Sequence, residues 1–240
     1  MSTRRRGLWA LGATAVVAAS AAVALADDPV PIKITANVKV TPNKAGTPRH
    51  PQGVKIKADA YVSIPRDVDP PLVQSVDVWF PKDGVYNGRK WPTCSEAALR
   101  RSGPSICTPK SVMGKGYAVA DADGTTTRPT GTILNGGQKR AYVYVVLQHP
   151  ARVREPLPID ITKLSGDPKW GYRAHVTIPR NLQIVAGIPL RVDEVHGTIG
   201  RGDWIATTHC PSDHKWRYHV ETHYSSQQIV KYDGTVACRS

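Results

Sequence analysis

The sequence predicts an all-β protein, an antiparallel two-sheet β-sandwich with one short helical turn held by a disulfide. Runs of about ten residues alternate between apolar and polar side chains, as strands with one buried face do. Pro, Gly, Asn and Asp separate these runs at short intervals, which is typical of the turns of a sandwich. No sustained helical period competes with this pattern.

Residues 1–26 have the pattern of a secretory signal peptide. Three arginines at positions 4–6 precede an apolar stretch at 8–24, and Ala24-Leu25-Ala26 supplies small residues for cleavage. The arginines also fit a twin-arginine signal, so the Sec and twin-arginine routes both stay open. We therefore expect a mature chain of residues 27–240 that forms a single sandwich domain without a membrane span. Its expected location is extracellular or at the cell envelope.

The first strands follow from the alternation. Residues 31–41 place five apolar side chains on one face and polar side chains on the other. Residues 42–53 are rich in Pro and Gly and are expected to form a loop. Residues 54–64 and 73–80 resume the alternation, and the second run ends in the turn Pro81-Lys82-Asp83-Gly84.

A short helix is expected next. Ser95 is a favourable N-cap, residues 96–101 favour one or two helical turns, and Gly103-Pro104 would end them. This helix is predicted to be an exception in a chain made of strands.

The four cysteines of an exported chain favour two disulfides, for which three pairings exist. Proximity in sequence favours Cys94–Cys107 and Cys210–Cys238. The first bond would close a loop of about 14 residues and stabilise the fold by roughly 3 kcal/mol in the chain-entropy model. A zinc site made of cysteines is disfavoured because the chain has no Cys-x-x-Cys motif.

The remaining chain predicts strands and turns. Residues 140–148 form the most strand-like run, which we expect to be central and buried on both faces. Gly114 and Gly116 indicate a bulge or a close backbone approach, and Asn135-Gly136-Gly137 indicates a hairpin. The other expected strands are residues 111–120, 131–134, 172–178, 190–199, 204–208, 215–224 and 229–237.

Four histidines, His209, His214, His219 and His223, crowd the last cysteine loop. On a strand, residues four apart have Cα atoms about 13 Å apart, so one zinc ion could bind His219 and His223 only at the limit of their reach. The order His-x-Glu-x-His also differs from the His-Glu-x-x-His of zinc proteases. We interpret this strand face as polar and solvated. A metal site made by the four histidines is kept as an alternative hypothesis.

Two further features are open to two interpretations. Five tryptophans beyond the signal peptide and nine tyrosines accompany a single phenylalanine, Phe80. Aromatic rings with a polar edge suit sugar stacking, and they suit a sandwich core with polar rims equally well. Arg201-Gly202-Asp203 matches a receptor-binding tripeptide, but its place between two expected strands favours a turn.

Four segments occur in a fixed order along the chain: residues 41–48 (TPNKAGTP), 91–107 (WPTCS to GPSIC), 111–118 (SVMGKGYA) and 207–238 (TTHCP to the last Cys). Together they resemble a family of uncharacterised exported bacterial proteins of high-GC Gram-positive lineages. The resemblance implies a two-sheet β-sandwich with paired cysteines bonded, and it brings no established activity. The histidine-rich last loop departs from the family pattern.

The net positive charge of the chain and the absence of catalytic motifs from its sequence favour a binding function. Removing the three signal arginines lowers the formal charge from +13 to +10, which favours polyanionic partners. The basic residues are scattered in pairs, an arrangement that also suits evenly solvated faces and disfavours nucleic acid. No Gly-x-Ser-x-Gly elbow or Gly-rich phosphate loop is present, so we assign no catalytic residue and no cofactor.

We therefore predict a secreted, non-catalytic binding or structural protein whose candidate partner is an anionic cell-envelope polymer. One alternative is a secreted hydrolase that acts on polysaccharide or peptide through a site assembled from separate loops. The other alternative is the metal-binding module that uses the C-terminal histidines.

Overall fold

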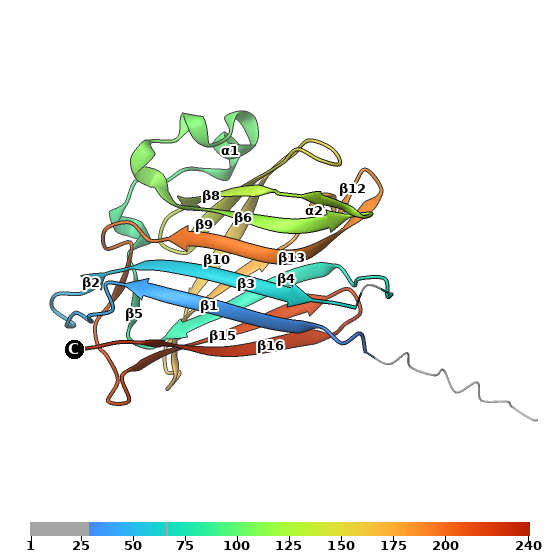
Figure 1. Cartoon of the computed structure of the whole chain (residues 1–240). Coiled ribbons are helices and arrows are strands. Elements are labelled where there is room, and N and C mark those ends of the chain that lie inside the picture. Colours follow the sequence, from blue (N-terminus) through green and yellow to red (C-terminus); the bar gives the residue numbers. More distant parts are fainter. Residues whose placement is uncertain (1–28, 66) are drawn as a thin grey trace, which may run out of the picture.

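The structure, a computed structural model, describes residues 29–65 and 67–240 (Figure 1). The expected signal peptide, residues 1–26, lies outside the described residues. Within the described part of the chain, none of the helices has the length and apolar character that a membrane-spanning helix needs.

Strands make up most of the chain. They are β1 (Lys33–Thr41), β2 (Gln52–Gly53), β3 (Lys55–Ser63), β4 (Val73–Pro81), β5 (Gly84–Tyr86), β6 (Val112–Ala122), β7 (Thr125–Thr127), β8 (Thr130–Asn135), β9 (Arg140–Leu147), β10 (Val153–Lys163), β11 (Trp170–Thr177), β12 (Ile184–Val185), β13 (Ile188–Ile199), β14 (Ile205–Thr207), β15 (Lys215–Tyr224) and β16 (Ile229–Ala237). The helices are α1 (Glu96–Ser102) and α2 (Arg180–Gln183), with 3₁₀ segments at Gly88–Lys90, Pro104–Ile106 and Pro109–Ser111.

The long strands form one antiparallel path in the order β1-β3-β13-β6-β8-β9-β10-β11-β4-β15-β16. Its two ends meet, because β1 and β16 lie side by side (Figure 1). The hydroxyl of Tyr232 donates to the carbonyl of Ala36 at 3.0 Å, and the amide of Arg239 donates to the carbonyl of Asn43 at 2.9 Å. The path therefore curls into a nearly closed sandwich, which confirms the predicted fold class.

A smaller sheet of β2, β14 and β5 lies beside the main path. Its central strand, β14, pairs Ala206 with Gly53 on one side and with Val85 on the other. It brings together three segments that are far apart in the sequence.

Most predicted strands occur where the alternation placed them. β1 alternates between exposed and half-buried residues along its whole length, and β15 and β16 have the predicted bounds. β9 is central and buried on both faces, as predicted. One of its faces packs in the cluster of Cys94, Leu99, Leu134, Tyr142 and Tyr144. The other face carries Ala141, which packs with Met113 and Trp204.

β10 was not among the predicted strands, and it contains Pro156 and Pro158, although proline disfavours a strand in the middle of a sheet. The structure shows how both prolines are accommodated. They pair with Tyr144 and Tyr142 of β9, whereas β11 pairs with β10 only from Ile159 onward. On that side of β10 no strand pairs with the proline positions, so the missing N–H groups cost little.

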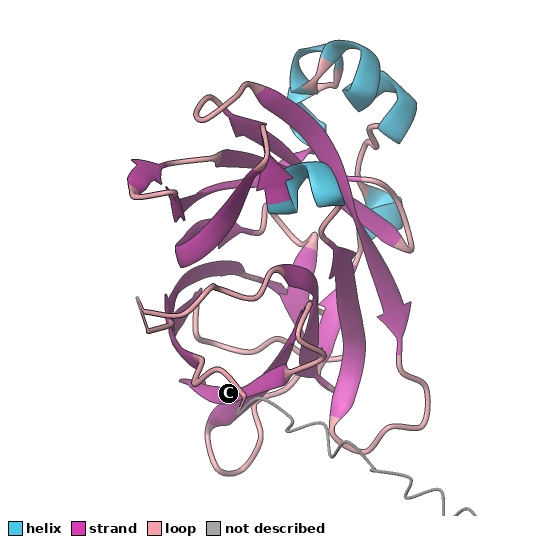
Figure 2. Ribbon diagram, turned by 90° about the vertical axis from the view of Figure 1, so that its right-hand side faces the viewer, coloured by secondary structure: helices cyan, strands magenta, loops and turns pink. Residues whose placement is uncertain are grey.

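The expected helix and disulfides are present. Ser95 caps α1 by accepting from the amide of Ala98 at 3.2 Å, and Gly103 ends the helix with a φ of 68°. Cys94 is bonded to Cys107, and Cys210 is bonded to Cys238. α1 lies outside the strands, on one side of the molecule (Figure 2).

Candidate functional site

The outer faces of β11, β4, β15 and β16 carry a continuous set of polar side chains, which we call the polar face. Strand register aligns them in rows across the sheet. One row contains Arg173, Trp79, His219 and Asp233, and the next contains His175, Asp77, Glu221 and Lys231. The alternation of β15 predicted that His219, Glu221 and His223 share one face. It could not indicate which side chains stand beside them.

His219 is held by two carboxylates and two aromatic rings. Its Nδ1 lies 2.8 Å from Oδ1 of Asp233, and its Nε2 lies 3.2 Å from Oε1 of Glu221. Its ring centroid is 5.1 Å from that of Trp79 and 6.3 Å from that of Trp170. The imidazole thus has a fixed orientation within a row of planar rings.

Glu221 is also paired with a lysine, through the same oxygen that contacts His219. The ammonium of Lys231 lies 2.9 Å from Oε1 of Glu221. The hydrogen bond from Lys231, followed by that from His219, lowers the pKa of Glu221 below its ordinary value. Glu221 is therefore a carboxylate at neutral pH.

Asp77 is a buried carboxylate at the centre of the polar face, 6% exposed. Three basic side chains surround it: His175 at 3.0 Å, Arg173 at 3.5 Å and His223 at 3.5 Å. A buried carboxylate needs such partners, because an unpaired charge would be costly. Asp77 therefore positions the basic groups of two neighbouring strands.

The structure separates the four histidines of the metal hypothesis into two pairs. His219 and His223 both contact Glu221, at 3.2 Å and 3.9 Å, and each also contacts a different aspartate, Asp233 or Asp77. His209 and His214 belong to the loop before β15, where the carbonyl of His209 accepts from the indole of Trp216 at 2.9 Å. Among residues 29–65 and 67–240, no three His, Cys, Asp or Glu side chains are grouped so as to hold a metal ion. The metal site stays a prediction.

A groove of about 510 Å³ adjoins the polar face. It lies between the turn that joins β4 to β5 and the turn that joins β10 to β11. Basic and aromatic side chains line it, namely Lys82, Lys163, Trp170 and Tyr172, together with Gly84, Val85, Leu164, Ser165, Gly166, Asp167, Gly171 and Thr208. This volume falls within the range of roughly 300–1,000 Å³ that is common for ligand sites.

The electrostatic character of the groove is basic. Lys82 and Lys163 are exposed, and neither forms an ion pair within 4.0 Å among the residues that the structure describes. Among the described residues that line the groove, Asp167 is the one acid, and it accepts from the amides of Trp170 and Lys169, both at 2.8 Å. These bonds hold the pKa of Asp167 below its ordinary value. The carboxylate of Asp167 therefore stabilises the turn between β10 and β11 by accepting hydrogen bonds from its backbone.

Trp170 joins the groove to the polar face. Its ring lines the groove and also lies 6.3 Å from His219, beyond which stands Trp79. The groove therefore offers two ammonium groups and one indole ring, and that indole lies beside His219 and its carboxylates on the polar face. Such an arrangement suits an elongated molecule that has both planar or sugar-like faces and negative charges.

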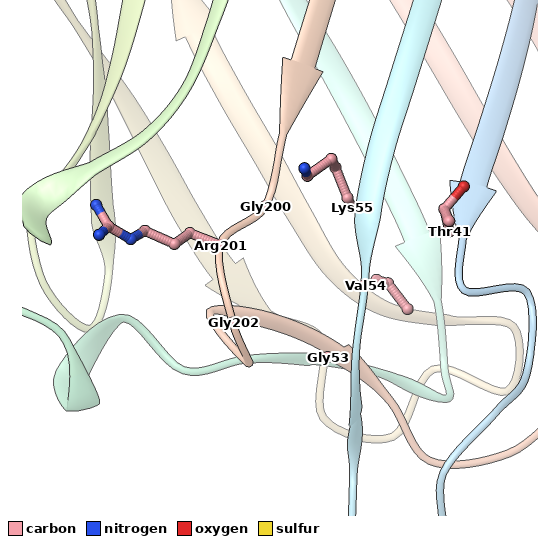
Figure 3. A pocket seen from close by; sticks show the side chains of 7 residues that line it. All are labelled: Thr41, Gly53, Val54, Lys55, Gly200, Arg201 and Gly202. Carbon is pink, nitrogen blue, oxygen red and sulfur yellow. The ribbon is translucent and has the colours of Figure 1, made fainter.

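A second hollow, of about 280 Å³, lies where residues 53–55 cross residues 200–202 (Figure 3). The backbones touch here, since a Cβ on Gly53 would lie 2.1 Å from the carbonyl oxygen of Gly202. In Figure 3 the side chain of Arg201 extends away from the crossing, and its guanidinium donates to the carbonyl of Pro109. We interpret this hollow as a structural crossing of two chain segments.

The tripeptide Arg201-Gly202-Asp203 forms a turn, as predicted, with φ of 53° at Gly202. The carboxylate of Asp203 accepts from the indole of Trp91 and from the ammonium of Lys90, each at 3.1 Å. The carboxylate therefore stabilises this loop from within the molecule.

No protein-family model matches the chain, and no curated protein matches it. One solved structure that it resembles is the N-terminal domain of the adhesin Sgo0707 of Streptococcus gordonii, with 15% sequence identity and a TM-score of 0.36. The likeness covers 88% of this chain and 33% of that chain. A TM-score this low transfers no function from one protein to the other. The geometry itself defines a disulfide-bonded all-β protein with a basic, aromatic groove.

Proposed function

We propose that this chain is an exported, non-catalytic binding protein that holds an anionic cell-envelope polysaccharide in the groove. The observation that carries the proposal is the placement of exposed Lys82 and Lys163 beside Trp170 in one groove of about 510 Å³. The two disulfides support export, because such bonds persist in oxidising compartments. Membership of the exported β-sandwich family that the sequence resembles is part of the same proposal.

Each part of the groove has a physical role in this proposal. The ammonium groups of Lys82 and Lys163 attract phosphate or carboxylate groups of the polymer, an attraction that salt weakens. The indole of Trp170 stacks on the apolar face of a sugar ring. Further along the polymer, the carboxylates of Glu221 and Asp233 accept hydrogen bonds from sugar hydroxyls. Binding needs no covalent step.

The test is equilibrium binding of the mature protein to three immobilised polymers: polygalacturonate, a glycerol-phosphate teichoic acid, and uncharged dextran. We expect binding to one or both anionic polymers and none to dextran. Affinity should fall tenfold or more as salt rises from about 0.05 M to about 0.5 M. A preference for polygalacturonate identifies carboxylate recognition, and a preference for teichoic acid identifies phosphate recognition.

A matched pair of double variants locates the site. Lys82→Gln with Lys163→Gln should weaken binding about tenfold. Arg101→Gln with Lys110→Gln, which removes the same charge from exposed positions in α1 and in the 3₁₀ segment Pro109–Ser111, should not. Equal losses in the two double variants would show that binding depends on net charge alone. An unchanged affinity for the groove variant would show that the polymer binds elsewhere.

A further inference from the structure

A second set of side chains on the outer face of β3, β13 and β6 has the composition of the polar face. We call it the His196 cluster, and it consists of Asp59, Tyr61, Tyr117, Glu194 and His196. Nδ1 of His196 lies 2.8 Å from Oδ1 of Asp59, and Nε2 lies 2.7 Å from Oε2 of Glu194. The His196 ring stacks on Tyr117, with centroids 4.7 Å apart, and meets Tyr61 edge-on at 5.7 Å.

On the polar face, His219 with Trp79, Glu221 and Asp233 forms a group that we call the His219 cluster, and the two clusters are built in the same way. In each, an aspartate stands directly opposite the histidine on one neighbouring strand: Asp59 for His196, and Asp233 for His219. An aromatic residue, Tyr117 or Trp79, stands directly opposite on the other neighbouring strand. A glutamate two residues away on the histidine's own strand contacts the second ring nitrogen.

The His196 cluster differs from a packed core in the exposure of its rings. Tyr61 is 45% exposed and Tyr117 is 42% exposed, although both are large aromatic residues. Because the imidazole between them is fixed by two carboxylates, the three rings form an ordered surface. Ordered, exposed tyrosines give a large contact area at a small cost in conformational entropy.

Basic groups border these rings as well. Lys57 lies 3.3 Å from Asp59, with its side chain 62% exposed, and Lys115 is exposed on β6 two residues before Tyr117. The chemistry is therefore that of the polar face beside the groove: planar rings, fixed carboxylates and neighbouring ammonium groups. It fits a sugar that carries a negative charge.

The two clusters lie on separate parts of the surface. β3, β1 and β16 stand between β13 and β15, which gives about four inter-strand spacings, or about 19 Å, along the curved sheet. The sheet path also begins at β1 and ends at β16, so the clusters lie on opposite sides of the junction between its two ends.

We propose that the His196 cluster is a second binding site for the same anionic saccharide, so that one molecule bridges two polymer chains. This inference rests on the proposed function of the groove. A protein with two sites of the same specificity can cross-link two polymer chains, whereas a protein with one site binds a single chain without cross-linking it.

The first experiment measures the stoichiometry of binding of short oligogalacturonate and short glycerol-phosphate oligomers by calorimetry. Wild-type protein should bind about two oligomers, and both Tyr61→Ser with Tyr117→Ser and, separately, Trp170→Ala combined with Lys82→Gln and Lys163→Gln should bind about one. The control Ile106→Ser, which alters another exposed apolar side chain, should retain about two.

The second experiment measures agglutination of beads coated with the polymer. Wild type and Ile106→Ser should agglutinate the beads, and both single-site variants should coat them without agglutination. One oligomer per wild-type molecule, unchanged by the tyrosine substitutions, would overturn the second site and leave the groove proposal standing. No binding by wild type to any polymer would instead overturn the proposed function itself.

Discussion

The indole nitrogen of Trp204 donates a hydrogen bond of 3.0 Å to the side-chain oxygen of Asn135, and both side chains are fully buried. The amide nitrogen of Asn135 donates to the carbonyls of Gly88, Trp91 and Pro92 at 2.8–3.1 Å. One side chain thus joins the β8–β9 hairpin to two loops that are distant in the sequence. This network holds together the end of the molecule where the smaller sheet lies.

Replacement of Asn135 by Leu should lower the free energy of unfolding by about 3–5 kcal/mol, because it leaves several buried polar groups without partners. Urea denaturation followed by tryptophan fluorescence measures this change. The matched substitution Asn37→Leu, at an exposed position of β1, should change stability by less than about 1 kcal/mol. Equal effects of the two substitutions would contradict a central role of Asn135.

The two disulfides should contribute unequally. Replacing Cys94 and Cys107 by Ser opens a loop with a sequence separation of 13, whereas replacing Cys210 and Cys238 opens one with a separation of 28. The chain-entropy relation gives losses of roughly 3 and 3.6 kcal/mol, so the second variant should have the lower melting temperature. Calorimetry of both double variants checks this order, and a reversed order would contradict it.

The His196–Asp59 pair should make stability depend on pH. Hydrogen bonds to Asp59 and Glu194 raise the pKa of His196, so its stabilisation is complete below the unfolded value near 6.5 and is lost as pH rises through the folded value. The bond from His196 lowers the pKa of Asp59, whose stabilisation is complete above about 3.9 and is lost as pH falls through the lowered value. The pair is therefore fully effective between about pH 4 and pH 6.5.

Melting temperatures measured from pH 4 to pH 9 test this dependence. His196→Gln should remove the decline in stability that follows the deprotonation of His196, and the control His50→Gln, at an exposed loop position, should preserve it. An identical pH profile for wild type and His196→Gln would show that the pair does not stabilise the fold.

The contact of Trp170 with the ligand gives a prediction about affinity. Trp170→Ala should weaken polymer binding about 5- to 30-fold, since one stacked ring contributes about 1–2 kcal/mol. Trp91→Phe, which keeps a ring at a position outside the groove, should leave the affinity unchanged. Fluorescence anisotropy of a labelled oligosaccharide measures both values. If Trp170→Ala binds the oligosaccharide with the affinity of wild type, Trp170 does not contact the ligand.

Local pattern was sufficient for the strands whose alternation is unbroken. β15 and β16 could be predicted to the residue, because every second side chain along them faces the core. β10 could not, since local rules do not show that the side of the strand at Pro156 and Pro158 has no neighbour. The alternation of side chains predicts each strand separately, whereas the partners with which a strand pairs depend on the arrangement of the whole sheet.

The same limit applies to the candidate sites. The histidine pattern of β15 drew attention to His219, but its partners Trp79 and Asp233 come from two other strands. In β13 a glutamate stands two residues before a histidine (Glu194 and His196), whereas in β15 a glutamate stands two residues after one (His219 and Glu221). This shared spacing is a signal in the sequence for the His196 cluster. Lys82, Lys163 and Trp170 meet only because the turn between β4 and β5 lies next to the hairpin turn between β10 and β11.

The most direct test of the groove proposal is the nuclear magnetic resonance of the tryptophan indole groups during titration with the short anionic oligosaccharide that binds best. The indole signal of Trp170 should shift progressively, and that of Trp204, buried against Asn135, should stay in place as an internal reference. A titration in which the oligosaccharide binds and the Trp170 signal does not move would contradict the assignment of the groove as the binding site.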